Sequence, residues 1–178
     1  MDIYFVSDFH LGHFNIIRYT NRPFSALEEM DSVIIRKFNE RVKEDDLVFF
    51  LGDFCMKTSS EAKEAPKNAF EYYRSQLICK NIIFIRGNHD NNNSTKTPIE
   101  SIVINHGGER IYLTHNPKYA KKDFHLNFCG HVHDKWKFQK IDRNSYIVNL
   151  SVENWDYYPI TFNEINQHFS IWRKSGEK

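Results

Sequence analysis

Residues 81–90 read Asn-Ile-Ile-Phe-Ile-Arg-Gly-Asn-His-Asp, an apolar run that ends in a cluster of polar side chains. The apolar part, 81–85, is short, continuous and rich in β-branched and aromatic residues, which predicts a strand buried on both faces. Asn88, His89 and Asp90 follow directly after it. The segment therefore predicts a buried strand with functional side chains at its carboxyl end.

The same arrangement recurs along the chain. Four more predicted strands each precede polar side chains: 3–7 precedes Asp8 and His10, 47–51 precedes Asp53, 110–114 precedes His115, and 127–130 precedes His131 and His133. Residues i and i+2 of an extended segment point to the same side, so each two-histidine or Asp/His pair is expected to aim at one point. Carboxylates, imidazoles and one carboxamide, without a thiolate, suit divalent ions such as Mn²⁺, Fe²⁺, Co²⁺, Ni²⁺ or Zn²⁺. Gly52, Gly87 and Gly130 adjoin three of the clusters, where glycine lets the backbone turn sharply.

Helices are predicted between these strands. Ser25 and Glu28 have the form of a capping box and precede apolar residues at helical spacing, from Met30 to Val42. Further predicted elements are a helix over 68–77, a hairpin of 99–104 with 110–114, a strand over 145–151 and a closing helix over 163–169. Periodicity alone predicts an α/β fold with mixed strands. The chain has no repeats, no Pro-rich linker and no composition break, which predicts a single domain over residues 1–178.

Composition limits the class of function. The 178 residues carry a net charge of +1, so no global field recruits nucleic acid or an anionic membrane, and a processive nuclease is disfavoured. Cys55, Cys79 and Cys129 lack motif spacing and are expected to be reduced thiols. The first residues enter a strand directly, without a signal-peptide pattern, and no apolar run reaches membrane-spanning length. These features predict a cytoplasmic protein without a membrane partner.

The ordered series Asp-x-His, Gly-Asp, Gly-Asn-His-Asp, His and Gly-His-x-His, from Asp8 to His133, resembles the calcineurin-like metallophosphoesterase superfamily. The segments 11–13, 21–24 and 152–155 are similar to a small, uncapped bacterial and phage subgroup of it. One departure is Met56, where many relatives carry an acidic residue; the position is not a metal ligand in the family. The resemblance implies a four-layer α/β/β/α sandwich of two mixed sheets with flanking helices, with the metals at the strand ends.

The resemblance also implies roles for the polar residues. Asp8, His10, Asp53 and His133 would hold a first metal ion, and Asp53, Asn88, His115 and His131 a second, with Asp53 bridging. Two such cations, with Mn²⁺ favoured, neutralise phosphoryl oxygens and acidify a water near neutral pH. His89 would stabilise the transition state and protonate the leaving oxygen, while Asp90 would orient and charge that imidazole.

Two further residues are candidates for substrate binding. His13 either lies over the phosphate or caps the turn after Leu11-Gly12. Arg22 either grips a phosphate oxygen with its guanidinium fork or is a solvated loop residue.

Two groups of lysines lie close in sequence to predicted ligands. Lysines alternate with aromatic residues over 135–140, and Lys118, Lys121 and Lys122 follow His115. They form either a cationic rim for a phosphate-rich substrate or a solvated face.

The predicted function is a metal-dependent phosphoric ester hydrolase that acts on a small phosphate ester, a nucleotide among the candidates. Phosphodiesters are the preferred substrate class, since no segment between motifs is long enough to form a lid, and phosphomonoesters are the alternative. Two other functions stay open: a non-catalytic protein-interaction module on the same scaffold, and a nuclease that acts on nucleic-acid ends. The interaction module is disfavoured because such scaffolds usually lose ligands, and all are present here.

Overall fold

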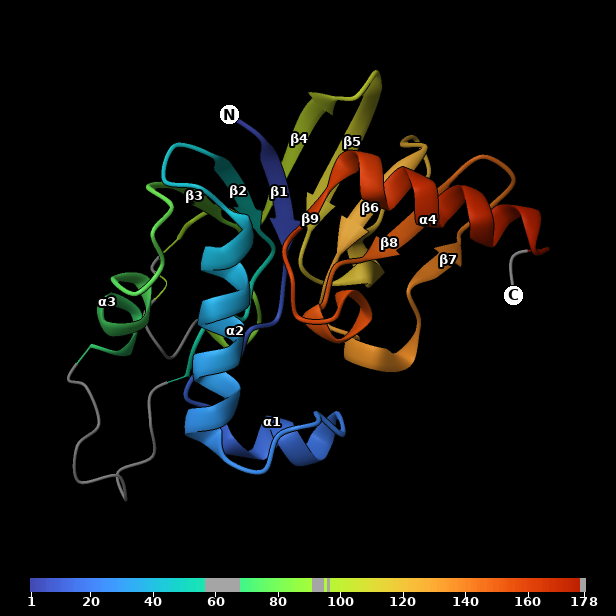
Figure 1. Ribbon diagram of the computed structural model, residues 1–178. Coiled ribbons are helices and arrows are strands. Elements are labelled where there is room, and N and C mark those ends of the chain that lie inside the picture. The colour runs from blue at the N-terminus through green and yellow to red at the C-terminus, as the bar shows by residue number, and fades with distance from the viewer. Residues whose placement is uncertain (57–67, 91–94, 96, 177–178) are drawn as a thin grey trace.

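The computed structural model describes residues 1–56, 68–90, 95 and 97–176, and two β-sheets form its centre (Figure 1). The predicted polar stretch 57–67 and most of the polar loop 91–95 lie outside the described residues. The first sheet has the order β3-β2-β1-β9 and consists of β1 (Ile3–Val6), β2 (Leu47–Phe50), β3 (Asn81–Phe84) and β9 (Ile160–Thr161). Strands β1, β2 and β3 are parallel, and β9 is antiparallel to β1.

The second sheet has the order β4-β5-β6-β8-β7. Its strands are β4 (Ser101–His106), β5 (Glu109–Thr114), β6 (Leu126–Cys129), β7 (Phe138–Lys140) and β8 (Tyr146–Asn149). The predicted hairpin is present as the antiparallel pair β4-β5, while β5, β6 and β8 are parallel. Both sheets are therefore mixed.

Four α-helices and three short 3-10 helices complete the described fold. The α-helices are α1 (Phe14–Tyr19), α2 (Leu27–Arg41), α3 (Ala69–Arg74) and α4 (Phe162–Lys174), and the 3-10 helices are η2 (Pro117–Tyr119), η3 (His133–Lys135) and η4 (Val152–Trp155). The predicted capping box of Ser25 and Glu28 does not form: Ala26 is the N-cap of α2, and the Ser25 hydroxyl and N–H donate to Glu29 instead. None of the described helices combines the length and apolar character that crossing a bilayer requires.

Two apolar cores lie on the two faces of the first sheet. One packs Val6, Val48 and Phe50 against helices α1, α2 and α3, with Met30, Ile34 and Phe38 of α2 fully buried. The other packs the first sheet onto the second, as in the edge-to-face contact of Phe5 and Phe128 at 5.1 Å, and includes residues of α4. The α/β class with two mixed sheets and flanking helices is confirmed.

The packing of the sheets brings the carboxyl ends of six strands together. Parallel neighbours end at the same edge, so β1, β2 and β3 end side by side, as do β5, β6 and β8. A bridge between Ser7, after β1, and Ser151, after β8, joins the two edges. The segments with predicted ligands all leave from this junction.

Candidate metal centre

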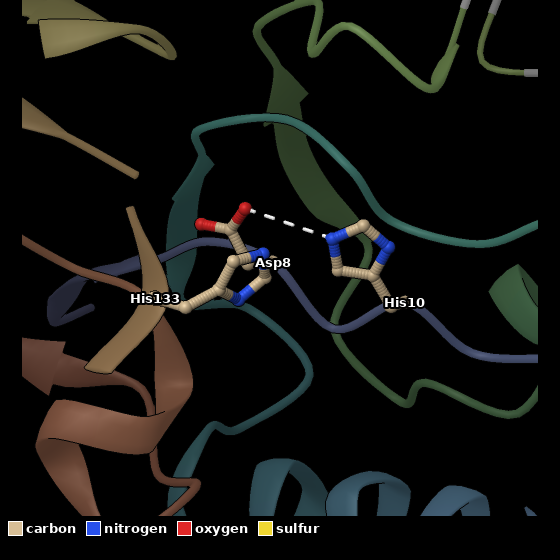
Figure 2. Close-up of side chains that lie close together, drawn as sticks. All are labelled: Asp8, His10 and His133. Carbon is tan, nitrogen blue, oxygen red and sulfur yellow. Dashed lines mark ion pairs between the residues drawn. The ribbon is translucent and has the colours of Figure 1, made fainter. Parts of the chain in front are cut away.

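The structure gathers the seven predicted metal ligands at this junction. Ligand atoms of Asp8, His10 and His133 all lie within 4.8 Å of one another, as do those of Asp8, Asp53 and His115. Figure 2 shows the first group, in which the Asp8 carboxylate faces His10 and His133.

Asn88 and His131 complete the set. The Asn88 Oδ1 lies 3.0 Å from Nε2 of His115 and 2.8 Å from Nδ1 of His131. One carboxamide oxygen and two imidazole nitrogens therefore converge beside the group that contains Asp53.

Asp53 lies between the two groups of donors. Its Oδ2 is 3.5 Å from Nε2 of His10 and 3.3 Å from Nε2 of His115, which follow strands of different sheets. Its Oδ1 accepts the backbone N–H of His89 at 2.9 Å, which orients the carboxylate. A single Asp53 oxygen thus faces histidines from both sheets.

The backbone at these residues is left-handed, which corrects the prediction of extended pairs. Asp8, His10, Asp53, His131 and His133 all have φ between 51° and 73°. L-residues rarely adopt this region, although Asp and His are enriched in it, and such strain gathers at functional sites. The side chains of Asp8 and His10, and of His131 and His133, therefore converge through alternating turns instead of strand pleating.

Glycine is required beside these residues mainly because the loops cross closely. A Cβ at Gly87 would lie 2.1 Å from Asp53 Oδ1, and one at Gly130 would lie 2.2 Å from Asp8 Oδ2. Of the three glycines at the clusters, only Gly52 has a positive φ, of 92°. The prediction that glycine serves sharp turns holds at Gly52, whereas Gly87 and Gly130 serve close approach.

The charges of the centre suit a cation. Burial opposes ionisation of Asp8, but the surrounding histidines hold the pKa of its carboxyl well below the usual range. Ser151 Oγ donates to Asp8 at 2.8 Å, as does the His131 backbone N–H at 3.0 Å. The centre therefore contains an ionised, buried carboxylate in a fixed orientation.

The histidines also fit a metal site. Burial lowers the pKa of His10, whose Nε2 is buried and has no hydrogen-bond partner among the described residues. Such an orphaned nitrogen carries a large penalty unless a ligand engages it. Burial opposes the charge on His115, yet the Asp53 and Asp8 carboxylates raise its pKa to about 9.

Residues 1–150 match the sequence profile of the calcineurin-like phosphoesterase superfamily domain. This chain belongs to the calcineurin-like phosphoesterase superfamily. An uncharacterized protein of Methanocaldococcus jannaschii is 38% identical over 172 residues, which cover 92% of this chain and 88% of that protein. The crystal structure of a protein of unknown function from Aquifex aeolicus matches with a TM-score of 0.64 and 24% identity, covering 93% of this chain and 97% of that one, and shares the fold. Membership of the superfamily indicates a metal-dependent phosphoesterase.

Arg22 is buried behind the candidate metal centre, so neither interpretation of the sequence, a phosphate-binding residue or a solvated loop residue, holds. Its side chain is fully buried, and its N–H groups donate to the carbonyls of Asp8 and Phe9, to Glu153 Oε1 and to the sulfur of Met30. These contacts occupy all five donors of the guanidinium. Arg22 therefore holds the ligand-bearing segment 8–10 in place.

Glu153 is a buried residue to which the sequence assigned no role. Its Oε1 accepts from Arg22 at 2.7 Å and lies 3.0 Å from Nδ1 of His133. Burial opposes its ionisation, but His133 and Arg22 lower its pKa. A carboxylate on the second nitrogen of a ligating histidine sets the ring's tautomer and orientation. Two sequence signals pointed to this region: Glu153 lies shortly after a buried strand, and segment 152–155 resembles the bacterial and phage subgroup.

Asp90 has a different role from the one predicted. Its Oδ2 accepts the backbone N–H groups of Gly87 at 2.7 Å and Asp53 at 3.0 Å, and its Oδ1 accepts that of Phe54 at 3.4 Å. The carboxylate thereby ties the loop after β3 to the loop after β2. Asp90 therefore fixes the backbone at Gly87, Asp53 and Phe54.

His13 and His89 lie beside the predicted ligands. The Nδ1 atoms of His13 and His10 are 3.4 Å apart, and the ring centroids of His10 and His89 are 5.2 Å apart. Burial, together with the neighbouring His10 and His89, lowers the pKa of His13 to about 4. Both rings border a cavity of about 310 Å³ that His10, His131, His133, Tyr19 and Lys135 also line.

Proposed function

We propose that this phosphoesterase binds two divalent metal ions and hydrolyses phosphodiesters. The position of Asp53 carries the proposal, because one of its oxygens faces His10 and His115, which follow strands of different sheets. Asp8, His10, Asp53 and His133 would hold one ion, and Asp53, Asn88, His115 and His131 the other. Two ions at this place, with Mn²⁺ favoured, would neutralise the phosphoryl oxygens and lower the pKa of a bound water.

The chain's own residues would then position and protonate the substrate. Asn88 contributes a neutral oxygen, which leaves the site more positive towards a phosphate than a third carboxylate would. His89 borders the cavity beside the ligands and would donate a proton to the leaving oxygen. His13, neutral at pH 7, would accept a hydrogen bond from the Nδ1–H of His10, so that the Nε2 lone pair of His10 is left to bind metal.

Among the described residues, two cavities border the ligand set, which supports a substrate with two organic arms. The first, of about 310 Å³, contains His13 and His89. The second, of about 480 Å³, is bordered by Asn88 and His115. A phosphodiester placed at the ligands could extend one arm into each cavity, whereas a monoester has only one arm.

Metal analysis and ester hydrolysis test this function together. The purified protein is expected to bind two divalent ions per chain and to hydrolyse bis(p-nitrophenyl) phosphate with Mn²⁺, and chelation should abolish hydrolysis. Asp53→Asn should weaken both ions, and His10→Ala mainly one. His168→Ala, on α4 and in contact with Trp155, is the control and should change neither. One tightly held ion per chain, or activity that survives exhaustive chelation, would contradict the proposal.

A further inference from the structure

The cavity of about 480 Å³ adjoins the metal centre and has a cationic, aromatic lining. We call it the lysine–tyrosine pocket; besides Asn88 and His115, the residues that matter for its chemistry are Arg86, Tyr112, Lys118, Tyr119 and Lys121. Side chains alternate along β5, so Tyr112 lies on the face opposite Ile111 and Leu113, which fill the core between the sheets. The pocket thus lies on the outer face of the second sheet.

Two lysines leave positive charge in this pocket. Lys118 Nζ lies 4.7 Å from the ring centroid of Tyr119, and Lys121 Nζ lies 4.5 Å from that of Tyr112. Arg86 is paired with Glu100, whereas neither lysine forms an ion pair with a carboxylate in the part of the chain that the structure describes. The pocket therefore carries the charge of two lysines without compensation.

The backbone that carries the lysines is held by the side-chain amides of Asn127 and Asn116. Lys121 donates its N–H to Asn127 Oδ1 at 2.8 Å, and its carbonyl accepts from Asn127 Nδ2 at 3.1 Å. Asn127 is fully buried on β6. The Asn116 side chain accepts the N–H of Lys118 at 3.0 Å. The loop between β5 and β6 is therefore held in place before any ligand arrives, which lowers the entropic cost of binding.

We infer that the lysine–tyrosine pocket binds one arm of the phosphodiester, and that this arm carries a planar ring and a further negative charge, as a nucleoside phosphate does. The inference rests on the proposed diesterase function. Asn88 and His115 place the pocket next to the reacting phosphate. Lys118 and Lys121 supply the charge for a second phosphate. Tyr119, with 57% of its surface exposed, supplies a ring on which a base can stack.

Three esters with the same cleavable p-nitrophenyl bond separate the effect of the planar ring on the arm from the effect of its negative charge. Methyl p-nitrophenyl phosphate has neither ring nor charge on its arm, thymidine 5′-(p-nitrophenyl phosphate) adds the nucleoside, and its 3′-phosphorylated form adds the charge. The wild-type protein is expected to show rising kcat/KM along this series.

Variants of the pocket residues show which side chains cause each rise in kcat/KM. Lys118→Ala/Lys121→Ala should lower kcat/KM for the 3′-phosphorylated ester by about five- to thirty-fold, with less loss at high salt, and should leave the methyl ester unchanged. Tyr119→Ala should lower kcat/KM for both thymidine esters by roughly five-fold or more. Lys122→Ala removes an exposed lysine that does not border the pocket and should change nothing. Equal losses on all three esters, or no preference of the wild type for the thymidine esters, would overturn the inference.

Direct binding separates this inference from the proposed function. If the wild type hydrolyses none of the three esters, the diesterase proposal fails, and calorimetric titration with thymidine 3′,5′-bisphosphate then tests the pocket alone. Binding to the wild type and to Lys122→Ala, with weaker binding to the double lysine variant, would support the pocket. Absent binding, or equal binding to all three proteins, would overturn it.

Discussion

The imidazole of His10 is buried, its Nε2 faces Asp8 and Asp53, and its Nδ1 lies 3.4 Å from Nδ1 of His13. A neutral ring can carry one proton, and placing it on Nδ1 lets His10 donate to His13 and keeps the Nε2 lone pair for a cation. The Nε2 without a hydrogen-bond partner among the described residues and the left-handed backbone at His10 are both costly in a folded protein. At the scale of the residue, His10 thus combines backbone strain and burial with the side-chain chemistry of a metal ligand.

His89→Ala is expected to leave the metal content nearly intact, because the backbone N–H of residue 89, not the imidazole, holds Asp53. Turnover should fall by roughly 10²–10⁴-fold on esters with poor leaving groups, the usual loss for a missing general acid. The loss should be much smaller for nitrophenolate, which leaves without a proton. Steady-state kinetics over a leaving-group series measures this, and equal losses across it would assign His89 to phosphate positioning.

Arg22→Lys separates a supporting role from substrate binding. Lysine keeps the charge but cannot reproduce five directed donors, so the free energy of unfolding should fall by roughly 2–3 kcal/mol. Metal affinity should fall by about ten-fold or more, because Glu153 and the segment 8–10 lose their anchor. Denaturant unfolding and metal titration check this. A higher KM with unchanged stability and metal affinity would instead show that Arg22 binds the substrate.

At the scale of elements, the local structure of segment 135–140 determines which of its lysines border the cavity of about 310 Å³. In the alternating segment 135–140, Lys135 still belongs to η3, and the strand β7 begins only at Phe138. Lys135 lines the cavity with His133, whereas Lys137 lies 4.0 Å from the ring centroid of Trp155 and does not line it. Of the two alternatives left open for this segment, a cationic rim or a solvated face, Lys135 fits the rim and Lys137 does not.

Helix α2 carries a buried acid that makes stability depend on pH. Asp31 accepts from the Tyr73 hydroxyl of α3 at 2.8 Å and from the Gly12 N–H at 3.1 Å, and burial raises its pKa to about 6. The folded state holds the proton more tightly than the unfolded state, in which the pKa is about 3.9. Its contribution to stability is therefore complete below about pH 4 and is lost as the pH rises through 6.

Asp31→Asn should remove this dependence. The unfolding free energy of the variant relative to the wild type is expected to increase by up to about 3 kcal/mol between pH 4 and pH 7. Denaturant unfolding of both proteins at several pH values, with chelator present, measures the difference. A difference that does not change with pH would contradict the raised pKa of Asp31.

At the scale of the whole molecule, the arrangement of the two cavities predicts preference for diesters. A monoester carries more negative charge and gains most where several cations surround the phosphate, and Arg22 is not available for that role. The kcat/KM for an aryl phosphodiester is therefore expected to exceed that for the matched aryl phosphomonoester, measured with the same metal. A reversed preference would show that one arm is sufficient for this site.

Much of the fold could be predicted because local pattern and burial agree. Continuous apolar runs such as 47–51 form strands buried on both faces, and ligands at their ends are adjacent because parallel strands end at one edge. The superfamily, and the candidate ligands that the fold brings together, followed from the order of the motifs. Asn81–Phe84, for instance, lies beside β2 and carries Asn88 towards His115, as residues 81–90 predicted. The predicted burial on both faces was wrong, because β3 is an edge strand whose side chains are only partly buried.

Tertiary structure alone decided which polar residues support that centre. Arg22 and Glu153 are 131 positions apart in sequence and meet only because η4 packs beside segment 8–10, so no local pattern reveals the pair. Asp90 and the close approach of Gly87 to Asp53 likewise depend on two loops that cross in space. Sequence patterns report periodicity and chemistry along the chain, whereas the burial of a charge depends on what the rest of the fold places around it.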